Sequence, residues 1–228
     1  MQEREVSTVD ASPRAEHCGR WVSPPFGEIR RMLAELAADF ARSNSAVYEI
    51  GCTTPSVLPL LQSRCAPDVR FVCADESPTL AASRRDQVAR IAGAREVLSV
   101  QIDWDRGVAL RNASVALLAN CPSRTRTIDQ TALFADVLRG LNDGGCLLLV
   151  ASVRGQDSLF NNLFARHRIE RHPQASQHRA LTPPRDQCED IASASTRREL
   201  RRALLRARFR SVDVFFEWYG TCAMAALK

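Results

Sequence analysis

The stretch VYEIGCT, residues 47–53, has the composition of a buried strand that runs directly into a tight turn. The apolar run 46–50 ends at Gly51, which has no side chain and lets a backbone approach a ligand closely. Amides at the start of a following helix would face that ligand. Thr53 and Pro55 stand where glycine-rich loops of this kind have further glycines. The stretch predicts either a ligand-binding loop or a plain strand–turn–helix connection.

Further apolar runs follow at regular intervals, and each predicts a buried parallel strand. They cover residues 69–74, 97–102, 114–119 and 146–151. Helical patterns precede and separate the strands, at 27–42, 56–64, 79–91 and 129–141. Pro59 should shorten or kink the second of these helices. Residues 142–145 (NDGG) predict a turn ahead of the fifth strand.

The chain continues with helical patterns at 159–171 and 196–208 and ends with two strand-like runs, 211–216 and 221–227. So short a link forces the last two strands to pair antiparallel, because a parallel crossover needs about a dozen residues. The sequence therefore predicts an α/β, Rossmann-like class I methyltransferase layout: a mostly parallel seven-stranded sheet with a C-terminal antiparallel hairpin. We expect a flexible arm at 1–20, a single domain over 21–228, and a helical lid insertion at 153–195.

Acidic residues follow two of the predicted strands. Asp75, with Glu76 beside it, comes directly after the second strand, where a carboxylate can accept both ribose hydroxyls of a nucleoside. The alternative is an acid that caps the helix after Ser77. In this fold Asp103 and Trp104 would sit at the adenine, with Asp103 accepting from the exocyclic amine and Trp104 packing on the ring. The alternative is a surface acid beside a half-buried tryptophan.

Asn120 follows the fourth strand and faces the reactive sulfonium in this fold, where it can orient a substrate or the amino-acid part of S-adenosylmethionine (SAM); an ordinary loop is the alternative. The stretch 167–185 holds histidines and arginines without ligand-like spacing, so we expect a lid that offers arginine to an anionic substrate, and no metal site. The basic helix 196–208 has apolar residues at helical spacing, Leu200, Ala203, Leu204 and Ala207, which we expect to be buried, so that its arginines lie on the opposite face. We therefore expect a solvated face rather than a nucleic-acid surface.

Composition is that of an ordinary soluble domain, with 45% hydrophobic and 25% charged residues. The net charge of +5 rests almost entirely on arginine, and does not by itself indicate a nucleic-acid partner. The eight cysteines lack zinc-site spacing, and we expect reduced thiols in a cytoplasmic protein. We expect no leader peptide and no membrane-spanning segment.

Together these residues resemble the carboxy-SAM synthase branch of the class I methyltransferases, a family that makes carboxy-SAM from SAM and prephenate for tRNA wobble-uridine modification. The segments that carry the resemblance are 48–53, 74–77, 103–104, 140–145 and 226–228. The resemblance implies SAM as the cofactor, a homodimer, and a carboxylate-binding arginine at Arg185. Phe26 stands where the family has a ligand-contacting tyrosine.

The expected catalytic residues are Asn120 and Arg185. The expected SAM-binding residues are Phe26, Glu49, Gly51, Cys52, Thr53, Asp75, Glu76, Asp103, Trp104 and Asn120.

Three main functions stay open, and a fourth is an enzyme that acts on tRNA, whose RNA binding would fall steeply with salt. The first is SAM-dependent transfer to a small molecule, which needs little beyond in-line positioning. The second consumes SAM itself, by cyclisation to azetidine-2-carboxylate and methylthioadenosine or by carboxy-SAM synthesis. The third is a non-catalytic protein of the same fold.

Overall fold

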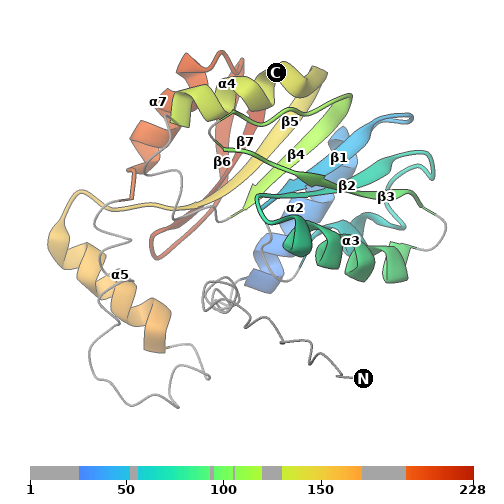
Figure 1. Ribbon diagram of the computed structural model, residues 1–228. Coiled ribbons are helices and arrows are strands. Elements are labelled where there is room, and N and C mark those ends of the chain that lie inside the picture. The colour runs from blue at the N-terminus through green and yellow to red at the C-terminus, as the bar shows by residue number, and fades with distance from the viewer. Residues whose placement is uncertain (1–25, 52–55, 93–94, 105, 120–129, 171–193) are drawn as a thin grey trace, which may run out of the picture.

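A single seven-stranded sheet runs through the molecule, in the strand order β3-β2-β1-β4-β5-β7-β6 (Figure 1). The computed structural model describes residues 26–51, 56–92, 95–104, 106–119, 130–170 and 194–228. Strands β1 to β5 pair in parallel, and β7 joins antiparallel between β5 and β6. The predicted fold class is confirmed, including the C-terminal hairpin.

The strands agree with the sequence prediction to within a few residues, except that β5 begins earlier. Their bounds are β1 Ala46–Ile50, β2 Arg70–Asp75, β3 Val97–Gln101, β4 Ala113–Ala119, β5 Leu141–Ser152, β6 Ser211–Trp218 and β7 Thr221–Leu227.

Helices cover both faces of the sheet. Their bounds are α2 Phe26–Phe40, the 3-10 helix η2 Leu58–Leu61, α3 Pro78–Ala92, α4 Gln130–Gly140, α5 Ser158–Glu170 and α7 Arg197–Arg206. In Figure 1, α4 and α7 lie side by side on one face, α2 and α3 lie on the other, and α5 stands beyond the sheet. No described helix has the length and apolar character needed to cross a bilayer.

The alternation of side chains along each strand divides the core into two layers. Tyr48 and Ile50 of β1 point into the layer beneath α4 and α7, whereas Val47 points into the layer with α2 and η2. Glu49 shares the direction of Val47. Its carboxylate therefore enters the layer between the sheet and helices α2 and α3.

Three expectations about secondary structure were wrong in detail. The helix predicted at 56–64 is only the short 3-10 turn η2, with Pro59 in its first turn. The strand predicted as buried at 97–102 is the sheet edge β3, and edge position leaves Leu98 and Val100 exposed. Residues 142–145 are not a turn before β5. They form an irregularity within it, where the register with β4 shifts and Gly144 has a positive φ.

Gly140, at the end of α4, offers a test of this packing. A Cβ built there would lie 2.8 Å from the Leu110 carbonyl oxygen, and backbone cannot give way cheaply. Gly140→Ala should therefore lower the free energy of unfolding by about 1–3 kcal/mol, measured by urea denaturation. Gly27→Ala in α2 is the matched control, because its Cβ meets nothing within 4 Å. The control should be neutral or stabilising by up to about 1 kcal/mol. Equal effects at the two positions would contradict the packing described for Gly140.

Candidate functional site

The candidate site lies at the edge of the sheet where β1, β2, β3 and β4 end. The chain order reverses between β1 and β4, and ligands of open α/β sheets bind at such a reversal, beyond the carboxyl ends of the strands. Gly51 leaves β1 with φ +79°, and its N–H donates to the Ala74 carbonyl at 2.8 Å. This left-handed backbone favours glycine, as the sequence predicted for a tight turn.

Glu49 ties the residues just before η2 to strand β1. Its carboxylate is 3% exposed and accepts hydrogen bonds from the Ser56 hydroxyl and, at 2.8 Å, from the Val57 N–H. The Ser56 hydroxyl in turn accepts from the Leu58 N–H at 3.2 Å. One buried side chain at the end of β1 thus anchors the residues that lead into η2.

Two arginines from different helices lie beside this carboxylate. Arg30 of α2 donates to the Ser56 carbonyl at 2.6 Å, and Arg84 of α3 is only 7% exposed. Burial raises the pKa of Glu49 above its usual range; the hydrogen bonds from Ser56 and Val57, and then the charges of Arg84 and Arg30, act against that rise. Glu49 is thus a buried acid held by hydrogen bonds and two nearby cations.

Asp75 ends β2 and is almost buried, with 9% exposure. Its Oδ1 accepts from the Ser77 N–H at 2.9 Å and closes a turn ahead of α3, whereas the cap of that helix is Ser77, whose hydroxyl accepts from the Leu80 N–H at 3.3 Å. Glu76 is half-buried, and its carbonyl accepts from the Gln101 side chain at 3.3 Å. A carboxylate has two oxygens and about four acceptor positions, so the hydrogen bond from Ser77 does not by itself prevent Asp75 from accepting ribose hydroxyls.

Asp103 and Trp104 follow β3 on the neighbouring edge. Asp103 is exposed and forms an ion pair with Arg106 at 3.4 Å. Trp104 is half-buried and packs against the core layer beneath α4. The corner therefore offers a carboxylate to solvent beside a fixed indole.

The remaining predicted residues are placed only in part. Phe26 is the first residue of α2, and its side chain is outside the described structure. Four other predicted site residues lie outside the described residues: Cys52, Thr53, Asn120 and Arg185.

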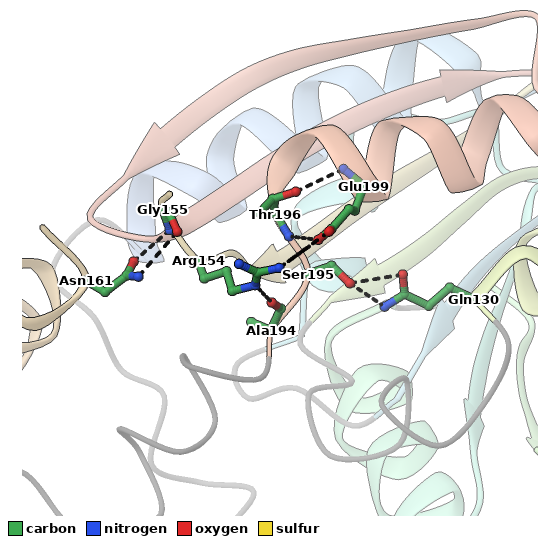
Figure 2. A network of polar contacts seen from close by, with 8 residues as sticks. All are labelled: Gln130, Arg154, Gly155, Asn161, Ala194, Ser195, Thr196 and Glu199. Atoms are coloured by element: carbon green, nitrogen blue, oxygen red, sulfur yellow. Dashed lines mark hydrogen bonds and ion pairs between the residues drawn. The ribbon is translucent and has the colours of Figure 1, made fainter. Parts of the chain in front are cut away.

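The described ends of the predicted lid insertion meet in a narrow polar neck (Figure 2). Arg154 donates through its backbone to the Ser195 carbonyl at 3.2 Å and through Nε to the Ala194 carbonyl at 2.9 Å. Its guanidinium also pairs with Glu199 at 3.4 Å. Gln130, at the start of α4, hydrogen-bonds the Ser195 hydroxyl at 3.2 Å. The neck therefore ties both ends of the insertion to α4 and α7, beside the end of β5.

Aromatic contacts attach α5 to the turn between β6 and β7. The Tyr219 ring lies 5.5 Å from Phe164 and 5.3 Å from His167, with the imidazole nearly parallel to it. Trp218 packs against the same ring at 5.0 Å. Such pairs add about 0.5–1.5 kcal/mol each beyond the area they bury. The insertion thus has an apolar attachment in addition to its polar neck.

Comparison of the sequence with known proteins identifies the family. The chain is 32% identical over 207 residues to a carboxy-S-adenosyl-L-methionine synthase of Methylococcus capsulatus, covering 90% of this chain and 86% of the relative. The chain belongs to the carboxy-S-adenosyl-L-methionine synthase family. A Klebsiella pneumoniae member of that family is 24% identical over the same share of this chain and 83% of the relative. No protein-family model matches the chain.

Solved structures agree on the fold. A SAM-dependent methyltransferase from Aquifex aeolicus superposes with a TM-score of 0.62 at 11% identity, covering 93% of this chain and 97% of that one. PigF, solved with SAH, gives a TM-score of 0.54 at 13% identity, covering 88% of this chain and 58% of PigF. Family and fold together confirm the predicted SAM-dependent enzyme of the methyltransferase fold.

Sequence reasoning missed Arg30, Arg84 and Ser56. A signal for Arg84 was available, because it falls on the helix face of Ala81 and Val88, which are both buried. An arginine on the apolar face of a helix is uncommon unless it has a partner. Arg30 lies in α2, one turn after the first residue of the helix. Nothing in the sequence indicated that Ser56 would meet Glu49.

The raised pKa of Glu49 predicts a pH dependence of stability. The folded state holds the proton more tightly than the unfolded chain, so stability from this group is full below the ordinary pKa of 4.5 and is lost as pH rises through the folded pKa. The free energy of unfolding of the wild type, relative to Glu49→Gln, should therefore fall as pH rises above 4.5. Urea denaturation at a series of pH values measures this difference.

Glu96→Gln is the control, because Glu96 is exposed. Four groups on the packed elements face Glu49: Arg30, Arg84, Ser56 and the Cys73 thiol. Burial, and then the negative charge of Glu49, raises the pKa of the Cys73 thiol to about 12. A difference that rises with pH would contradict the raised pKa.

Proposed function

We propose that this chain binds SAM across the ends of β1 to β4 and converts it to carboxy-SAM with prephenate as the carboxyl donor. The observation that carries the proposal is the 32% identity to a carboxy-SAM synthase over 90% of the chain. The reaction replaces one hydrogen of the SAM methyl group by a carboxylate. Prephenate gives up its ring carboxyl group as CO2 and its ring hydroxyl as hydroxide, which takes the methyl proton and leaves as water, so that phenylpyruvate remains and the methyl carbon forms its new bond to CO2. The reaction therefore requires a site for SAM and a neighbouring cation for an anionic donor.

The described residues support the SAM half of this site. Gly51 brings a backbone turn to the ligand, Asp75 and Glu76 are proposed for the ribose, and Asp103 with Trp104 for the adenine. These side chains follow three neighbouring strands, β1, β2 and β3, at the same edge of the sheet. That spacing matches an extended nucleoside lying across strand ends.

The other proposed contacts follow from the resemblance. Phe26 and Glu49 belong to the SAM site, with Glu49 acting through the chain that it anchors at Ser56 and Val57. Cys52 and Thr53 are proposed in the loop. Asn120 would orient the reacting groups and Arg185 would bind the donor carboxylate.

Methyl transfer to a small molecule is the second candidate. One observation favours it: Phe26 lacks the hydroxyl that a tyrosine supplies in the carboxy-SAM synthases. Transfer to an already nucleophilic acceptor needs no such group, because orientation alone lowers the barrier.

A homodimer in the cytoplasm completes the proposal. The exposed Leu159 and Phe160 on α5 support self-association, and the buried free thiols of Cys73, Cys146 and Cys222 fit a reducing compartment. Light scattering of the purified protein measures the oligomeric state.

The decisive test is mass spectrometry of the protein incubated with SAM, with and without prephenate. We expect a product heavier than SAM by one CO2, formed only when prephenate is present. S-adenosylhomocysteine in the presence of an acceptor would instead establish methyl transfer. Methylthioadenosine from SAM alone would establish the cyclising reaction.

Asp75→Asn tests the ribose contact in the same assay. Asparagine keeps an acceptor for the Ser77 N–H, so the turn ahead of α3 survives, but it cannot accept two hydroxyls as a carboxylate does. The KM for SAM should rise about tenfold to a hundredfold. Asp213→Asn on the exposed face of β6 is the matched control and should leave the KM unchanged.

A further inference from the structure

Two guanidinium groups share the buried space beside Glu49. Arg84 belongs to α3, which packs on β2 and on η2, while Arg30 comes from α2 on the same face of the sheet. The charges of both arginines oppose the rise that burial causes in the pKa of the Glu49 carboxyl. Burial lowers the pKa of the Arg30 guanidinium, the charge of Glu49 opposes this, and the charge of Arg84 lowers the pKa further. Two positive charges thus converge from two helices on one carboxylate.

The hydrogen bonding of these arginines is incomplete. Arg84 is buried, with only 7% of its surface exposed. No hydrogen bond or ion pair joins it to any residue that the structure describes. Arg30 uses Nη2 for the Ser56 carbonyl, but its Nε is buried without a partner among those residues. Buried guanidinium groups normally satisfy their donors, because an unpaired one is expensive to desolvate.

The charges do not balance either. Glu49 supplies one negative charge, and its two oxygens are already engaged by Ser56 and Val57. Arg30 and Arg84 supply two positive charges, since arginine does not lose its proton in proteins. The cluster therefore carries an excess positive charge, with free donors, at the point where the chain emerges from β1.

We propose that Arg30 and Arg84 form a subsite that binds a carboxylate group of the bound ligand, beside the chain that joins β1 to η2. A carboxylate supplies the missing negative charge and accepts hydrogen bonds from guanidinium in its preferred geometry. The Ser56 carbonyl holds the Arg30 guanidinium in this position. The inference rests on the proposed function, whose ligands carry this group: SAM on its amino-acid end, and the carboxyl donor.

Location favours the SAM carboxylate. Arg30 lies one helical turn after Phe26, and Glu49 lies two residues before Gly51, so the subsite borders the proposed SAM contacts. It also lies on the α2 and α3 face, away from the neck of the insertion at α4 and α7.

Calorimetry with Arg84→Met tests the subsite, using SAM and decarboxylated SAM as the two probes. The affinity of the variant for SAM should fall about tenfold to a hundredfold, because a charge-assisted hydrogen bond is lost. Decarboxylated SAM should bind wild type and variant equally. Arg85→Met, at the next residue, is the matched control, since the Arg85 side chain is 40% exposed and pairs with Asp86. It should bind SAM as the wild type does.

Thermal unfolding without ligand, read beside the two affinities, separates this role from a structural one. Arg84→Met takes one of the two cations away from the buried Glu49, so the variant should unfold at a somewhat lower temperature than the wild type while keeping its affinity for decarboxylated SAM. A lower unfolding temperature with equal losses for SAM and decarboxylated SAM would overturn the subsite.

Steady-state kinetics with both substrates distinguish the two sources of carboxylate. Unchanged SAM binding with a raised KM for prephenate would assign the subsite to the donor. If wild type binds SAM while Arg84→Met changes neither affinity nor KM, the subsite is wrong and the proposed function stands. A wild type that binds no SAM overturns both.

Discussion

A buried carboxylate at the end of the central strand organises the candidate site. Glu49 accepts hydrogen bonds from the Ser56 hydroxyl and the Val57 N–H. These bonds tie the residues just before η2 to strand β1. The loop lacks the repeated glycines usual at this position. The hydrogen bonds to Glu49 fix Ser56 and Val57, the residues that lead into η2.

The same carboxylate explains why two helices bring arginines into an apolar layer. Desolvation disfavours an isolated ionised acid, and nearby cations offset that cost. Arg30 from α2 and Arg84 from α3 supply them, and they supply more positive charge than one carboxylate requires. Stability and ligand binding are therefore coupled in this cluster: the groups that let Glu49 remain buried also leave donors for an anion.

Much of the architecture follows from local patterns. Apolar runs and turn residues located the seven strands, and the short link 217–220 was enough to require an antiparallel hairpin. The predictions of secondary structure and burial failed where the outcome depends on which strand lies next to a segment in the sheet. The exposed face of β3 depends on its being the edge strand, and the irregularity at 142–145 depends on its pairing with β4. Neither neighbour can be read from the strand's own residues.

The sequence alone determined the fold class, the family resemblance and the acidic positions at strand ends, because strand periodicity and residue spacing are local properties of the chain. Only the tertiary structure decided that Glu49, Ser56, Arg30 and Arg84 meet. These residues come from β1, the segment before η2, α2 and α3, and their meeting depends on how both helices pack on one face of the sheet. Packing joins positions far apart in sequence, and a single sequence carries no direct record of such contacts.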